Sequence, residues 1–99
     1  MAGLKDILQE TMQGYAGRAF NGYSYLTFTK DADLFSVISV GQVKDKRIVN
    51  MGLVVRLHDD LIIIEHDIND KSLVDALVQA GVPRAKIILA YAGETLETA

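Results

Sequence analysis

Two apolar runs near the middle of the chain, VNMGLVVRL (residues 49–57) and LIIIEHDI (residues 61–68), are separated only by His58, Asp59 and Asp60. β-Branched residues dominate both runs, and such residues favour extended strands. The acidic pair between the runs is typical of a tight turn. The two runs therefore predict one long β-hairpin, against which the rest of the chain has to pack.

The segments before this hairpin predict a helix followed by two more strands. Apolar residues recur every three or four positions over residues 3–16, as they do on one face of a helix. Residues 23–29 and 34–43 are rich in aromatic and β-branched side chains, which favour strands. Gly41 is a candidate β-bulge, and residues 44–47 form a charged hairpin turn. Together with the central hairpin, these strands predict a four-stranded antiparallel meander.

The segment after the hairpin predicts a second helix. Asn69 or Asp70 is suited to cap a helix whose apolar stripe begins at Leu73. Gly81 and Pro83 mark the end of this helix, since glycine accepts the left-handed conformation of a helix cap and proline cannot continue a helix.

The final segment predicts a short buried strand, IILAY (residues 87–91), and then a small polar tail, residues 93–99, that frays. The expected fold is therefore α+β, with an N-terminal helix, a four-stranded antiparallel meander, a second helix and a short final strand. One domain is expected to span residues 1–99.

Composition limits the class of protein. The chain has 99 residues, of which 49% are hydrophobic, and it contains no cysteine, which excludes disulfides and thiolate metal sites. The N-terminus lacks the apolar stretch of a signal peptide, and no apolar run has the length of a membrane span, so we expect a cytoplasmic protein. The net charge of −3 argues against direct nucleic-acid binding.

Two polar triplets, HDD (residues 58–60) and EHD (residues 65–67), suggest at first a metal site or an acid–base pair. A two-residue hairpin turn pairs Leu53 with His66, which places His58 and His66 at opposite ends of the hairpin. Neighbouring residues on a strand also point to opposite faces. We therefore expect no catalytic residues, no metal and no cofactor, and we predict that the protein is not an enzyme.

The run SLVDALVQAGVPRAKIILAY (residues 72–91) resembles the end of the XisI family, known as fdxN element excision controlling factors. In that family a helix leads through Ala-Gly-Val-Pro and a basic residue into an apolar strand. The preceding order of elements is also similar, with an acidic residue just before the helix. The residues that carry the resemblance are Asp67, Ala80, Gly81, Val82 and Pro83.

The resemblance implies a non-enzymatic accessory factor. Members of the family are similar to factors that work with a protein partner, XisH, in the controlled excision of a DNA element by a separate recombinase. The alternative is a small-ligand-binding or minor enzymatic domain that uses a cleft between the second helix and the sheet, with Asp67 or His66 at its rim.

Apolar residues lie on both faces of the predicted hairpin. The face expected to form the core carries Val49, Met51, Leu53, Val55, Leu57, Ile62 and Ile64. The opposite face is a candidate interface, made of Ile48, Val54, Arg56, Leu61, Ile63 and Glu65. Two helices cannot fully cover both faces of the sheet, so the pattern predicts a homodimer or a dimer of dimers joined by the second face.

Overall fold

The computed structural model describes residues 3–19, 21–29, 31 and 33–95. In chain order, the elements are α1 (Leu4–Gln13), β1 (Gly17–Ala19), β2 (Gly22–Phe28), β3 (Leu34–Val43), β4 (Lys46–His58), β5 (Leu61–Asp67), α2 (Leu73–Gln79), the short 3₁₀ turn η1 (Arg84–Lys86), β6 (Ile87–Leu89) and a second 3₁₀ turn, η2 (Ala90–Ala92). The predicted α+β class is confirmed, although several helix and strand ends differ from the expected ones.

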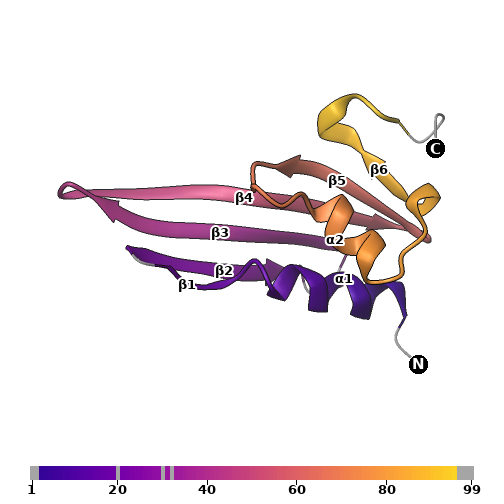
Figure 1. Ribbon diagram of the computed structural model, residues 1–99, viewed down its shortest axis with the longest axis horizontal. Helices are drawn as coiled ribbons and strands as arrows, with labels where there is room; N and C mark the ends of the chain where they lie inside the picture. Colours follow the sequence, from indigo (N-terminus) through magenta and orange to yellow (C-terminus); the bar gives the residue numbers. More distant parts are fainter. Residues whose placement is uncertain (1–2, 20, 30, 32, 96–99) are drawn as a thin grey trace.

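The six strands form one sheet in the order β1-β2-β3-β4-β5-β6 (Figure 1). The first five strands are antiparallel to their neighbours, and β6 runs parallel to β5. The predicted meander of four strands is therefore extended at both edges, by β1, which the sequence pattern did not indicate, and by the final strand.

Both helices lie on one face of the sheet and contact each other (Figure 1). The hydrophobic core fills the space between this helix layer and the sheet. Its buried members are Leu8, Met12, Phe35, Val37, Leu53, Val55, Ile62, Ile64, Leu73, Leu77, Val82 and Ile87. The sheet face away from the helices is called the far face below.

A β-bulge at Gly52 decides which residues of β4 reach the far face. Val37 pairs with Leu53, but the next residue, Ile38, pairs with Met51, so Gly52 is the extra residue. One extra residue reverses the side to which the following side chains point. Met51 and Val49 consequently lie on the far face, 50% and 58% exposed, and the prediction that they belong to the core is wrong.

The expected bulge at Gly41 is also wrong, because Gly41 pairs in regular register with Gly22 and Ile48. A second bulge lies at Glu65, since Val54 pairs with His66 and Val55 with Ile64. This bulge shifts the expected partner of His66 by one residue, from Leu53 to Val54.

Both hairpin turns of the central strands contain two residues. The turn between β4 and β5 is Asp59-Asp60, as predicted, with His58 paired to Leu61. The turn between β3 and β4 is Lys44-Asp45, shorter than predicted, and both residues have positive φ, of 50° and 64°. Such left-handed turns match the twist of the strands that they join.

The β3–β4 hairpin extends well beyond the helices, which gives the molecule its elongated outline of 45 × 31 × 26 Å (Figure 1). This projecting part of the hairpin is called the arm below. In the described part of the chain, no helix is long and apolar enough to span a membrane.

Candidate interaction surface

The far face carries a contiguous set of apolar side chains along β2, β3 and β4. Cross-strand neighbours in an antiparallel pair point to the same face of a sheet. Tyr23, Val40 and Val49 therefore form one row, and Tyr25, Ile38 and Met51 form the next. These six residues are called the far-face patch.

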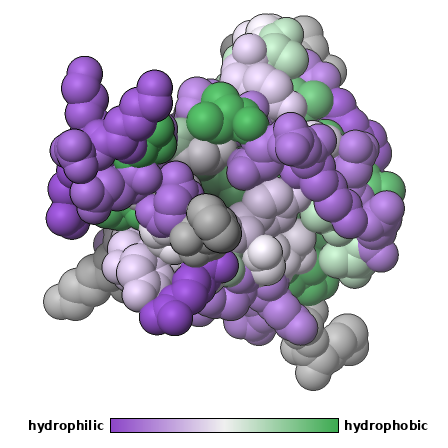
Figure 2. Space-filling view, turned by 60° about the vertical axis from the view of Figure 1, so that its left-hand side comes forward, coloured by the Kyte–Doolittle hydropathy of each residue, from purple (hydrophilic) through white to green (hydrophobic). Residues whose placement is uncertain are grey.

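The patch is open to solvent. Tyr23 and Tyr25 are 45% and 52% exposed, which is close to the values of Met51 and Val49, while Ile38 and Val40 are half-buried between them. Figure 2 brings the arm side of the molecule forward, where exposed apolar residues lie among strongly hydrophilic ones. Contiguous apolar surface of this kind usually marks a site of protein contact.

Arg18 holds the tyrosines of the patch in place. Its guanidinium lies over the Tyr23 ring, 5.1 Å from the ring centroid, and its Nη2 donates a hydrogen bond of 2.8 Å to the Tyr23 hydroxyl. The rings of Tyr23 and Tyr25 are stacked, with centroids 6.2 Å apart. Sequence reasoning missed Arg18 because β1, which carries it, is only three residues long.

The predicted interface residues are divided by the structure. Val54, Arg56, Leu61 and Ile63 lie on the far face, but Ile63 is only 3% exposed and is thus buried within a single chain. Ile48 lies on the other face of the arm, opposite Gly41, because of the bulge at Gly52.

The charged members of that predicted interface neutralise each other within the chain. Arg56 Nε donates to Glu65 Oε2 over 2.6 Å, and both side chains are partly exposed. Each of the two charges already has its counter-ion within the chain, so the pair does not require a charged residue from a second subunit. The bulge at Glu65 turns this carboxylate toward Arg56 on the neighbouring strand.

Asp67, the acidic residue of the family resemblance, caps α2 from six residues before the helix. Its Oδ2 accepts a hydrogen bond of 2.7 Å from the Leu73 N–H, and its Oδ1 accepts from the backbone N–H and the side-chain amide of Asn69. The residue at the N-cap position itself is Ser72, and not Asn69 or Asp70 as predicted. Asp67 therefore has a structural role at the start of the helix.

The Asp67 network also reaches the bulge in β4. Asn69 Nδ2 donates a hydrogen bond of 3.0 Å to the Gly52 carbonyl, which also accepts a hydrogen bond from the Ile68 N–H. Nearby, the hydroxyl of Tyr15, which follows α1, donates a hydrogen bond of 2.8 Å to the Lys71 carbonyl. Partial burial, together with the negative charges of Asp67 and Asp75, raises the pKa of Tyr15 above its usual value, so it remains a donor.

Residues Ala80, Gly81, Val82 and Pro83 form the end of α2, as predicted. Gly81 has φ of 102°, and its N–H donates to the Val78 carbonyl, while the Val82 N–H donates to the Leu77 carbonyl. This pair of hydrogen bonds defines the Schellman helix cap. Val82 is buried in the core beside Leu77.

The end of β6 is fixed by Glu94, which lies in the segment predicted to fray. Its Oε1 accepts a hydrogen bond of 2.8 Å from the Leu89 N–H, and its Oε2 accepts one of 3.0 Å from Arg84 Nη2. The Leu89 N–H, and then Arg84, hold the pKa of Glu94 below its usual value. Residues 96–99 of the predicted tail lie outside the described residues.

The two polar triplets do not converge on one site. His58 and Asp59 form an exposed pair 3.6 Å apart at the β4–β5 turn, whereas His66 lies opposite Val54 further along the strand. Among the residues described, no group of three histidine, aspartate or glutamate side chains is arranged to hold a metal ion.

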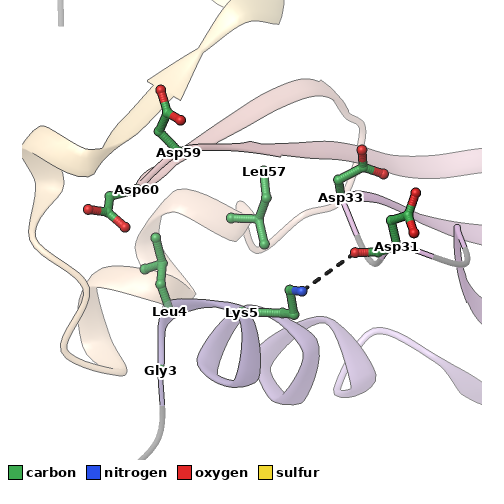
Figure 3. Close-up of a pocket in the computed structure, with 8 residues that line it drawn as sticks. All are labelled: Gly3, Leu4, Lys5, Asp31, Asp33, Leu57, Asp59 and Asp60. Carbon is green, nitrogen blue, oxygen red and sulfur yellow. Dashed lines mark hydrogen bonds between the residues drawn. The ribbon is translucent and has the colours of Figure 1, made fainter.

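An acidic depression of about 380 Å³ lies at the end of the sheet opposite the arm tip. Its aspartates come from two separate turns, and the apolar Leu4 and Leu57 lie between them (Figure 3). Lys5 Nζ reaches the backbone carbonyl of Asp31 over 3.5 Å. The residues that line the depression are Gly3, Leu4, Lys5, Asp31, Asp33, Leu57, Asp59 and Asp60.

The space between α2 and the sheet, predicted as a possible ligand cleft, is filled by core side chains. Leu73 and Leu77 are completely buried there. A depression of about 560 Å³ does lie beside α2, but neither His66 nor Asp67 lines it. His66, one of the two predicted rim residues, lies in the β4–β5 hairpin, and the other, Asp67, caps the start of α2.

These features define a small α+β protein with one helix-covered sheet face and one partly apolar far face. The chain matches the sequence model of the XisI family, described as XisI protein, over residues 2–98, and it belongs to this family. The recognition made from the residues around Gly81 is therefore confirmed.

Two solved structures share the fold. A XisI-like protein from Anabaena variabilis ATCC 29413 superposes with a TM-score of 0.66 at 21% identity, covering 87% of this chain and 78% of that one. The fdxN element excision controlling factor XisI from the same organism superposes with a TM-score of 0.66 at 22% identity, covering 88% of each chain. The comparison with curated proteins found no match.

Proposed function

We propose that this protein is a non-enzymatic accessory factor that acts through a protein partner in the controlled excision of a DNA element. The observation that carries this proposal is the match to XisI along nearly the whole chain, residues 2–98. One solved structure with this fold is a factor that controls excision of the fdxN element. The proposal carries the role over by analogy from the family, whose model matches the whole domain and not one motif alone.

The chemistry of the family residues supports an accessory role. Asp67 has both carboxylate oxygens engaged in hydrogen bonds, and Gly81 and Val82 have their N–H groups in a helix cap. These residues stabilise the fold and offer no free acid, base or nucleophile. The exposed apolar surface and the net charge of −3 are consistent with contacts to protein.

The partner that we propose is an XisH-like protein, and the role places both proteins in the cytoplasm. The test is co-expression of this chain with the XisH-like product of a neighbouring gene, followed by affinity capture through a tag on that product. We expect the two proteins to co-purify and to sediment as one complex.

Two controls make this experiment decisive. The tagged protein is first expressed without this chain, and it is then expressed with an unrelated acidic protein of similar size. The proposal is supported if the tagged protein captures this chain and does not capture the unrelated acidic protein. If both proteins are folded and do not associate at about 10 µM, a concentration that detects even weak contacts, the proposal is wrong.

A further inference from the structure

We propose that the arm binds one extended strand of a partner protein along the free side of β4, and that this strand carries acidic residues where it lies beside the arm tip. The free side of residues 46–51 is called the arm edge below. This contact deepens the proposed function and rests on it for the identity of the partner, whereas a synthetic peptide tests the arm edge independently.

The arm edge has no neighbouring strand. β3 pairs with β4 from Lys46 to Arg56, but β5 pairs only with residues 53–58. The line of β5 ends beside Gly52, whose carbonyl accepts hydrogen bonds from the Ile68 N–H and the Asn69 side chain. Residues 46–51 are all exposed, and no described element lies beside them on this side of β4 (Figure 1). An added strand therefore has room to lie in line with β5.

The register shows which backbone groups face the arm edge. The Gln42 N–H donates a hydrogen bond to the Asn21 carbonyl, on the β2 side of β3. Gln42 therefore belongs to a non-hydrogen-bonded pair with Arg47, and the Arg47 N–H and C=O point away from β3. Because hydrogen-bonded and non-hydrogen-bonded pairs alternate, the N–H and C=O of Val49 point the same way. These groups can form the main-chain hydrogen bonds that give affinity in strand addition.

The side chains next to the arm edge are apolar on both faces of β4. Val49 and Met51 lie on the far face as part of the far-face patch, and Ile48 lies on the helix side. A depression of about 230 Å³ on the helix side is lined by Ile48 and Asn50, among other residues. Alternate side chains of an added strand would point to the two faces and cover these residues. The middle of the strand therefore needs apolar side chains.

The charge at the arm tip selects acidic residues for one end of the strand. Residues 44–47 comprise three cations and Asp45, a net charge of +2, whereas the remainder of the chain carries −5. Within the described part of the chain, Lys44, Lys46 and Arg47 form no ion pair. Opposite charges on neighbouring strands stabilise their pairing. Residues 46–51 of a second copy contain no carboxylate, so an identical edge does not supply these charges.

The direction of β5 favours an antiparallel strand. β5 is antiparallel to β4, and a strand that continues its line toward the arm tip has the same direction. Antiparallel pairing is also slightly more stable per residue than parallel pairing. The acidic residues then lie at the C-terminal end of the added strand, opposite Lys46 and Arg47, and its apolar residues lie opposite Val49 and Met51.

A synthetic peptide with this pattern tests the arm edge without a partner protein. The peptide Val-Thr-Val-Val-Glu-Glu, blocked at both ends, matches the residues from Met51 back to Lys46 and is titrated into the labelled full chain by NMR. We expect shifts of the amides of residues 46–51, and about tenfold weaker binding of the same peptide with Lys-Lys in place of Glu-Glu. Equal affinity of the two peptides, or no binding at about 5 mM, overturns the inference.

Val49→Pro tests the backbone contact. Proline removes an N–H that points away from β3, so the hydrogen bonds of the hairpin remain, and proline is tolerated on edge strands for this reason. Val49→Thr is the matched control, because it keeps the N–H and a β-branched side chain of similar size. Val49→Pro should weaken both peptide binding and capture by the XisH-like protein about tenfold or more, while Val49→Thr should retain both. Circular dichroism verifies that the variants are folded.

Arg47→Glu tests the charge without a change to the backbone, and it decides the matter if Val49→Pro does not fold. This variant should bind the Lys-Lys peptide better than the Glu-Glu peptide, which reverses the wild-type preference. Lys71→Glu changes the net charge equally at an exposed position before α2, away from the arm, and should keep the wild-type preference. An unchanged preference in Arg47→Glu would contradict the proposed charge pairing.

The two proposals fail separately. If the partner is captured equally by wild type, Val49→Pro and Arg47→Glu, the inference is wrong and the proposed function stands. If wild type captures no partner but binds the Glu-Glu peptide at residues 46–51, only the proposed function is contradicted. A wild-type dimer that Val49→Pro dissociates would assign the arm edge to a second copy, and a single-stranded oligonucleotide that displaces the peptide would assign it to nucleic acid. Either result overturns the inference.

Discussion

Gly81 has a backbone conformation that leaves little choice of side chain. Its φ of 102° lies in the region that side chains with a β-carbon rarely adopt, yet nothing lies within 4 Å of the place that a β-carbon would take. A substitution here therefore changes the conformational energy of the helix end without a steric clash.

Gly81→Ala should lower the free energy of unfolding by about 1–2 kcal/mol, the cost of a left-handed conformation for a residue with a β-carbon. Gly41→Ala is the matched control, since Gly41 does not have a positive φ and a β-carbon there would meet its nearest atoms at 3.5 Å or more, which is ordinary contact. Urea denaturation of both variants measures the difference. Equal midpoints would mean that the cap at the end of α2 contributes nothing to stability.

The residues around Gly81 could be predicted from the sequence because a helix cap is local, and its hydrogen bonds join residues at most five positions apart. The role of Asp67 could not be predicted in the same way. Its carboxylate reaches Leu73 only because the intervening loop folds back, and nothing in a local pattern shows this path. Arg18 was missed because its partner, Tyr23, lies on the adjoining strand.

At the scale of elements, the bulge at Gly52 and the start of α2 form one joint. Asn69 connects the two, since its amide donates to the Gly52 carbonyl on one side and to Asp67 on the other. The sequence pattern predicted β3 with its observed ends but placed the bulge at Gly41. An isolated glycine within the apolar run at Gly52 was the better signal, but alternation alone cannot distinguish a bulge from continuous register.

A double-mutant cycle can measure this joint. Asp67→Ala removes acceptors from the partly buried N–H groups of Asn69 and Leu73 and should cost about 1–3 kcal/mol, while Asn69→Ala should cost about 1 kcal/mol. The two side chains share a hydrogen bond. The double variant should therefore lose less stability than the sum of the two single losses, and we expect the difference to be about 0.5 kcal/mol or more. Strictly additive losses in urea denaturation would show that bulge and helix cap act independently.

At the scale of the whole molecule, the two helices leave one face of a six-stranded sheet without a helical layer. The sequence correctly indicated that two helices are too few for both faces. It misassigned Val49 and Met51 to the core, since one bulged residue is enough to exchange the faces of the arm. The charge separation between arm and body was hidden by the modest net charge.

The arm leaves one edge of β4 without a partner strand, and this determines where the protein can aggregate. β3 pairs with β4 from Lys46 onward, whereas β5 pairs only with residues 53–58 of β4. Among the described residues, the arm therefore offers the backbone groups of residues 46–51 along one edge, a run of the length that a cross-β template needs. Lys46 and Arg47 place positive charges at the tip end of this edge, which oppose pairing with an identical edge, so replacing both with glutamine should speed fibril formation in a concentrated solution.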